Sequence, residues 1–355
     1  MNQPRRFSPL AAGLAAFGAY CCMYAFRKPF TATDYAGAVA FGAVDFKTGL
    51  VIAQVLGYAL SKLIGIKVIA ELRPGQRTGL FVGLIVMAEL ALVGFGWVGD
   101  HWLALPLLFL NGLPLGMIWG IVFSYLEGRK TTEILGAMLA VSFIVSSGAV
   151  KSVGAALLGS GWVSSPYWMP AATGLLFFLP LVGFAFWLRS FPPPTVADVA
   201  ARTRREPMDA TDRGQLLRRL GPGLLGIVLY YVLITAFRDV RDNFAPELWT
   251  ALGYGDAPAV FTVAELPIAL LTLLPLFLGY FIVDNRRALR YYHALIVAST
   301  LLILGATIAF TAGRLDGAYW MVAVGLGLYL GYVPLNAIYF DRLVGAFRQV
   351  ATAGF

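Results

Sequence analysis

Residues Tyr20–Arg27 (YCCMYAFR) return at an offset of 211 positions as Tyr231–Arg238 (YVLITAFR). Both copies close an apolar stretch, and both end on an arginine. At the same or nearly the same offset, further segments match in chain order: Ala53-Gln54 with Ala264-Glu265, Leu84–Val86 with Leu295–Val297, and Gly112–Gly116 with Gly327–Gly331. A repeat of this length predicts a chain built from two similar halves.

The composition indicates that lipid surrounds these halves. The chain is 59% hydrophobic and 13% charged, with a mean hydropathy of +0.75, whereas soluble domains carry about 25% charged residues. Because a membrane span needs roughly 20 apolar residues and must satisfy its own backbone, we predict ten spanning helices. They cover residues 8–26, 48–64, 78–98, 103–123, 134–158, 167–188, 222–238, 258–282, 291–311 and 318–340.

Lysine and arginine predict the orientation in the membrane. Twenty of the 27 lie in loops on the side of the N-terminus, six lie on the other side, and Lys151 lies within a span. Because cytoplasmic loops are enriched in positive charge, we expect a cytoplasmic N-terminus, an uncleaved first helix and a location in the cell's inner (plasma) membrane. The net charge of +8 then reflects topology, and nucleic acid is not an expected partner.

One long polar stretch, residues 190–221, divides the chain. It predicts a cytoplasmic linker between an N-terminal six-helix half, 1–189, and a second half, 222–355. The second half holds only four predicted spans, and 350–355 matches the start of an eleventh. We therefore expect an all-α polytopic membrane protein with a 6+6 helix repeat. About ten full spans are present, and the C-terminal helices are missing because the chain is a fragment or a truncated product.

This architecture resembles the major facilitator superfamily. The resemblance includes the loop Gly279–Arg287, which is similar to that superfamily's glycine, aspartate and double-arginine signature, although the Gly–Asp spacing is one residue longer. In the first half the corresponding loop matches this signature poorly, and Glu71 stands where an aspartate is usual. The resemblance implies a secondary transporter that works by alternating access, not an enzyme.

Three shorter motifs are similar to the organophosphate:phosphate antiporters. They are Tyr24–Lys28 (YAFRK), Tyr58–Lys62 (YALSK) and Arg238–Asp242 (RDVRD). In that family one arginine from each half grips a phosphate, which by matched position implies Arg27 and Arg238 here. The stretch 26–30 (FRKPF) is also similar to an uncharacterised bacterial membrane family, which leaves the substrate open.

Helix geometry supports a role for these arginines. Tyr20, Tyr24 and Arg27 are spaced by four and three residues and share one helix face, as do Tyr231 and Arg238. An arginine that faces lipid costs about 2.5–3.5 kcal/mol at mid-bilayer. The two side chains therefore either face a central cavity, where their planar groups suit phosphate or carboxylate, or extend to the outer headgroups.

Other charged residues within spans are candidates for the same site. Lys62 and Lys151 would add positive potential. Glu265 and Glu89 are intramembrane carboxylates, which by default indicate proton coupling or an ion pair. Glu265 could pair with Arg27 or Lys151, and the sequence does not decide between them.

Two further groups have structural interpretations. Asp284, Arg286 and Arg287, with Glu71 at the matching position, are predicted to form a charge latch at the cytoplasmic face. Gly112, Gly116 and Gly120 recur every four residues, as do Ala323, Gly327 and Gly331, which predicts close helix packing.

The function predicted is transport of a small anionic solute, organophosphate or phosphate first and an organic acid second, by a monomer in the bilayer. No phosphate-binding glycine loop and no Cys/His cluster is present in the sequence, so neither ATP hydrolysis nor a cofactor or metal is expected. Two alternatives stay open: proton-coupled transport of a neutral or zwitterionic solute through Glu265 and Glu89, and a sensor or scaffold that no longer transports.

Overall fold

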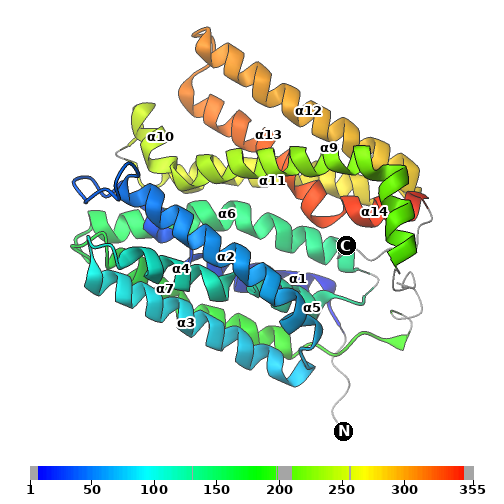
Figure 1. Cartoon of the computed structure of the whole chain (residues 1–355), viewed down its shortest axis with the longest axis horizontal. Helices are drawn as coiled ribbons and strands as arrows, with labels where there is room; N and C mark the ends of the chain where they lie inside the picture. The colour runs from blue at the N-terminus through cyan, green and yellow to red at the C-terminus, as the bar shows by residue number, and fades with distance from the viewer. Residues whose placement is uncertain (1–6, 130, 197, 199–209, 256, 348–355) are drawn as a thin grey trace. The chain divides into compact units, whose positions relative to one another are not determined.

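The computed structural model describes residues 7–347 except 130, 197, 199–209 and 256 (Figure 1). Within this part of the chain the regular structure is helical apart from one isolated bridge between Phe41 and Val44. The predicted start of an eleventh helix at 350–355 and the middle of the predicted linker lie outside the described residues. The all-α prediction is confirmed.

The chain forms two compact units. The first comprises Met1–Glu127, Ser142–Pro193 and Asn243–Val263, and the second comprises Gly128–Val141, Pro194–Asp242 and Ala264–Phe355. The segment after the seventh predicted span therefore belongs to the first unit. The division into halves at the central linker stays a prediction.

The first unit is a bundle in which α2 packs on α4, α3 on α4 and α7, and α1 on α7 and α5 (Figure 1). Its helices are α1 (Pro9–Tyr24), η1 (Pro29–Ala32), α2 (Phe46–Ala70), η2 (Pro74–Gln76), α3 (Arg77–Val98), α4 (Ala104–Leu115), α5 (Ile118–Leu126), α7 (Met169–Arg189) and α10 (Ala245–Ala251).

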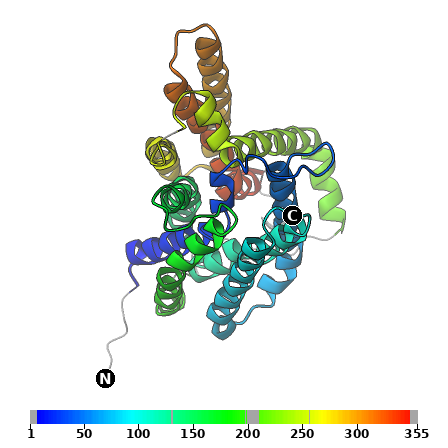
Figure 2. The same ribbon diagram turned by 90° about the vertical axis from the view of Figure 1, so that its left-hand side faces the viewer.

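In the second unit α12 packs along α13, as the two orange helices in Figure 2 show, and both contact α14. These helices are α12 (Asn285–Thr311), α13 (Gly317–Ala337) and α14 (Tyr339–Phe347). Three helices contribute residues to both units: α6 (Thr132–Gly159), α9 (Ala210–Asn243) and α11 (Val260–Tyr280).

The side chains on the bundle surface fit a lipid environment. Nine helical stretches within the described residues are long and apolar enough to cross a membrane, and α1 is a shorter apolar helix. Large apolar side chains are exposed along them, for example Ile66 at 71% and Leu179 at 78%. Exposed tryptophans, Trp97 and Trp162, stand at helix ends, where aromatic residues mark the membrane–water interface. The chain is a multi-pass membrane protein.

Each of the ten predicted stretches is helical in the structure; nine are long enough to cross a membrane and the first, α1, is shorter. Three of the differences from the predicted bounds have a physical reason. The predicted span 103–123 is divided into α4 and α5 near Pro114 and Gly116, where the missing N–H of proline weakens the helix. The span predicted at 318–340 likewise ends at Ala337, after Pro334. The helix that contains the seventh predicted span, α9, begins at Ala210, so the end of the predicted linker is helical. Residues 210–220 include leucine, glutamine and arginine, which favour helix without being apolar throughout.

The predicted stripes of small residues do bring helices together. A β-carbon on Gly112 would strike the backbone carbonyl of Gln54, and one on Gly57 would strike that of Phe109, so α2 and α4 meet backbone to backbone. In the second unit Gly327 lies against the carbonyl of Ser299 in α12. The prediction of close packing is confirmed in both units.

Candidate functional site

Arg27 lies just past the end of α1, among tyrosine rings. Its guanidinium carbon is 3.9 Å from the ring centre of Tyr58 in α2 and 5.8 Å from that of Tyr24. The rings of Tyr20 and Tyr24 meet edge to face at 5.5 Å, as expected for residues on one helix face. Arg27 is 8% exposed, so most of its surface is covered by other residues of the protein.

An amide bridge fixes the peptide that carries this arginine. Gln54 donates to the carbonyl of Arg27 at 3.0 Å and to the Asn111 side-chain oxygen at 2.7 Å. Asn111 in turn donates to the carbonyls of Phe26 and Ala88, both at 3.0 Å. Asn111 is fully buried. One side chain of α4 therefore ties the end of α1 to α2 and to α3. Asn111 is not among the site residues predicted from the sequence, although a polar residue within an apolar span was an available signal.

We expect Asn111→Ala to destabilise the first unit. The change removes three buried hydrogen bonds, to the carbonyls of Phe26 and Ala88 and from the Gln54 amide, and losing the partner of a buried polar group costs about 1–3 kcal/mol. Unfolding in detergent, followed by circular dichroism, measures the loss. Ser190→Ala is the matched control, because that exposed hydroxyl bonds only the Trp187 carbonyl in its own helix turn. Equal unfolding midpoints for the two variants would contradict the bridging role.

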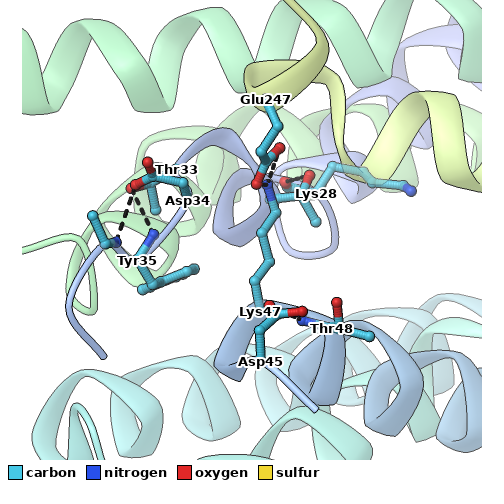
Figure 3. A network of polar contacts seen from close by, with 10 residues as sticks. Lys28, Thr33, Asp34, Tyr35, Asp45, Lys47, Thr48 and Glu247 are labelled. Carbon is cyan, nitrogen blue, oxygen red and sulfur yellow. Dashed lines mark hydrogen bonds and ion pairs between the residues drawn. The ribbon is translucent and has the colours of Figure 1, made fainter. Parts of the chain in front are cut away.

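Lys28 and Lys47, two of the six basic residues placed on the side opposite the N-terminus, are buried side chains. Lys28 donates to the side-chain oxygen of Asn243 at 2.7 Å. Lys47 reaches both carboxylate oxygens of Glu247 in α10, at 2.5 and 2.8 Å (Figure 3). Beside it, Asp45 caps α2, and hydrogen bonding to Thr48 lowers the pKa of that carboxyl. These contacts hold the start of the Asn243–Val263 segment on the first unit.

The predicted lysines occupy different settings. Lys151 in α6 is buried, with 2% of its surface exposed. Its neighbour Ser152 donates to the carbonyl of Pro258 at 2.8 Å. Lys62, by contrast, is exposed at the surface of α2, where its ammonium lies 5.1 Å from the centre of the Tyr58 ring. The structure thus brings Lys62 to the same ring as Arg27.

In the second unit, Arg238 also lies over a tyrosine. Its guanidinium carbon is 4.0 Å from the ring centre of Tyr332 in α13, and it forms an ion pair with Asp239 at 2.7 Å. The ring of Tyr231 stacks on Tyr332 with centroids 5.3 Å apart, and its hydroxyl donates to Asn336 at 3.2 Å. Tyr332 was missed in the sequence, because nothing in the repeat marks it.

Glu265 forms an ion pair with Arg241, which is not among the site residues predicted from the sequence. Its carboxylate meets Arg241 at 2.7 Å, with side chains 12% and 7% exposed. Arg241 also donates to the carbonyl of Met321 at 3.3 Å. The two partners suggested from sequence were Arg27 and Lys151, and the pair observed is with Arg241, one helical turn beyond Arg238 on α9.

Glu89 is the other predicted carboxylate. It lies in the middle of α3, is 6% exposed, and neither of its oxygens has a hydrogen-bond partner among the described residues.

The residues of the predicted latch lie at the ends of helices. Asp284 caps α12 by accepting from the backbone N–H of Arg287 at 2.8 Å. Arg286 donates to the carbonyl of Ala346 in α14 at 3.4 Å. Glu71 is exposed at the end of α2. A role for these residues in a transport cycle stays a prediction.

The sequence matches the model of a family of unknown function, DUF5690, over residues 29–355, and the chain belongs to that family. A comparison with curated proteins gives no match.

Among solved structures, the chain is similar to a D-xylose–proton symporter, with 15% identity, a TM-score of 0.57, and 96% of this chain and 86% of that chain covered. It is equally similar to the xylose transporter XylE from E. coli in a partially occluded inward-open conformation, with 14% identity, a TM-score of 0.57, and coverage of 96% and 89%. These likenesses confirm the predicted fold of the major facilitator type.

Proposed function

We propose that the protein is a secondary active transporter that moves a small anionic solute across the cell's inner membrane by alternating access, with its N-terminus in the cytoplasm. The fold is shared with transporters whose substrate is a sugar, so the anionic preference is argued from this chain's own residues. The observation that carries it is the repeated arginine on a tyrosine face: Arg27 on Tyr58 and Arg238 on Tyr332.

The chemistry of this pairing suits an anion. A tyrosine ring attracts a guanidinium through its face, whereas phosphate or carboxylate binds along the guanidinium edge through two parallel hydrogen bonds. The ring therefore orients the guanidinium through its face and leaves the edge, with its N–H donors, available for an anion. In this proposal Arg27 and Arg238 each recognise an anionic group, with an organophosphate or phosphate first and an organic acid second.

The remaining predicted residues have supporting roles in this proposal. Lys62 and Lys151 add positive potential. Tyr20, Tyr24 and Tyr231 shape the aromatic surroundings of the arginines, which their ring contacts support. Glu265 neutralises Arg241, as Asp239 pairs with Arg238 in the conformation observed.

Uptake by the full chain in liposomes tests the proposal. The probes are radiolabelled inorganic phosphate, a sugar phosphate and a dicarboxylate, each with and without the same anion inside. We expect uptake of at least one probe, and a fall of about tenfold or more for Arg27→Ala and for Arg238→Ala, because tenfold corresponds to about 1.4 kcal/mol and a charged hydrogen bond is worth about that or more.

Arg314→Ala is the matched control, because Arg314 is an exposed residue in the turn between α12 and α13. Uptake that survives in both alanine variants and in the control alike would remove the anion-binding role of the two arginines. Failure of the wild-type protein to take up any of the anions would remove the anionic substrate itself.

A further inference from the structure

Glu89 is an isolated acid in the interior of the first unit. It is the thirteenth of the 22 residues of α3, which places it in the middle of the span. Its side chain is 94% buried, and no hydrogen bond to either carboxyl oxygen is found among the described residues. Buried carboxylates are normally paired or hydrogen-bonded, so this residue needs a separate explanation.

The carboxyl group lies directly on the backbone of α7. A β-carbon on Gly174 would strike Oε2 of Glu89, and the same position would touch the ring of Phe26. Glycine at 174 therefore makes room for the acid group between α3 and α7. Phe26 immediately precedes Arg27, so the carboxyl group lies near the peptide that carries this arginine.

Among the described residues, no charged side chain of the elements packed most extensively against α3 lies beside Glu89. The elements with the most extensive contacts to α3 are α4, α5, α7 and η2. Their ionisable residues, with that of α3 itself, are Tyr125 in α5, Arg189 at the end of α7 and Arg77 at the start of α3. At 1.5 Å rise per residue, Arg77 is about 18 Å from Glu89 along α3, and Arg189 is about 22 Å from Gly174 along α7. Arg27 directs its guanidinium onto Tyr58 in α2.

We propose that Glu89 is a proton-binding site of this protein. An ionised carboxylate buried without a partner costs several kcal/mol, so the group is neutral in the conformation observed. Release requires water to reach the carboxyl group, which requires α3 and α7 to separate at Gly174. The O–H bond then breaks, the proton passes to water, and the carboxylate that remains keeps the two helices from closing until it is protonated again.

The structure links this site to Arg27. Asn111 donates both to the carbonyl of Ala88, which precedes Glu89, and to that of Phe26, which precedes Arg27. A shift of α3 at Glu89 is therefore transmitted to the arginine peptide. Proton binding stands without the proposed function, whereas coupling of the proton to anion movement rests on it.

Infrared spectroscopy of the purified full chain in lipid nanodiscs tests proton binding directly. We expect a protonated-carboxyl C=O stretching band at neutral pH that is lost in Glu89→Gln, which keeps the shape and neutrality of the acid. Asp34→Asn is the matched control, because Asp34 is exposed and caps only the backbone of Ala36; it should leave the band intact. A Glu89→Gln spectrum identical to that of the wild type overturns the proposal, whatever the transport assay gives.

Release is tested in the same sample by raising the pH. We expect the band to disappear reversibly while the helical content is kept. A band that persists until the protein unfolds marks a permanently protonated structural acid and overturns the proposal. If the wild type carries an anion, the Glu89→Gln variant should keep anion exchange but lose the increase in uptake that an imposed pH gradient produces; an unchanged response overturns the coupling.

Discussion

The Glu265→Gln variant is expected to lose about 3–5 kcal/mol of stability, because it strands the buried charge of Arg241. The two side chains form an ion pair at 2.7 Å and are 12% and 7% exposed. Glutamine keeps the size and one acceptor oxygen of the native side chain, so the loss reports the charge and not the packing. Arg241 has little room to move away, since a β-carbon on Gly325 would already touch its guanidinium.

Two comparisons make this result specific. The double variant Arg241→Met/Glu265→Gln should recover most of the stability, because removing both charges leaves no uncompensated ion in the interior. Asp239→Asn is the matched control: it breaks the Arg238–Asp239 pair, whose side chains are 15% and 28% exposed, and pairs near the surface are worth about 0–1 kcal/mol.

Unfolding midpoints in detergent, measured for all three variants, give the comparison. Equal losses for Glu265→Gln and Asp239→Asn would show that burial does not set the strength of the Arg241 pair. A double variant less stable than Glu265→Gln alone would contradict the stranded-charge explanation.

The spans were predictable from the sequence because the bilayer imposes one requirement on all of them. A chain in lipid must hide its backbone polar groups, and long apolar stretches do so only as helices. What the apolar pattern could not provide were the interruptions. Pro114 divides one predicted span into α4 and α5. Another helix is longer than its predicted span: α9 begins at Ala210, within the polar stretch, because helix propensity does not depend on hydrophobicity.

The candidate site was predictable only in part. The repeat identified Arg27 and Arg238, since both copies conserve the position within one chain. The repeat did not predict that these arginines contact Tyr58 and Tyr332, because packing between helices determines such contacts. Lys47 was assigned to a loop by its place in the sequence, and α10 buries it through Glu247; this connection between distant residues has no local sequence signal.

Residues at matching positions of the repeat make different contacts in the two units. Gln54 and Glu265 occupy matching positions in the two copies. Gln54 donates to the backbone carbonyl of Arg27, whereas Glu265 binds the guanidinium of Arg241. An amide can bond a carbonyl without bringing a charge into the interior, while a carboxylate there requires a cation. The second unit supplies that cation one turn beyond Arg238.

The largest packing effect is expected for Gly112→Leu, which should prevent the first unit from folding or cost about 3 kcal/mol or more. Overpacking a tight core typically costs about 1–3 kcal/mol when side chains can adjust. Here the obstacle is backbone: a β-carbon at Gly112 would meet the carbonyl of Gln54 and, at 3.1 Å, the amide nitrogen of Tyr58. Separating α4 from α2 would also break the Gln54–Asn111 bridge behind Arg27, so yield and thermal stability in detergent should both fall.

Gly83→Leu is the matched control, because a β-carbon at this exposed glycine inside α3 meets nothing within 4 Å. Leucine is a better helix former than glycine by roughly 0.5–1 kcal/mol, and at an exposed position of a membrane span it adds only apolar surface. The same substitution should therefore be neutral or stabilising in α3 and severe in α4. If both variants fold with unchanged midpoints, α2 and α4 do not require backbone contact, and the interpretation of the glycine stripe is wrong.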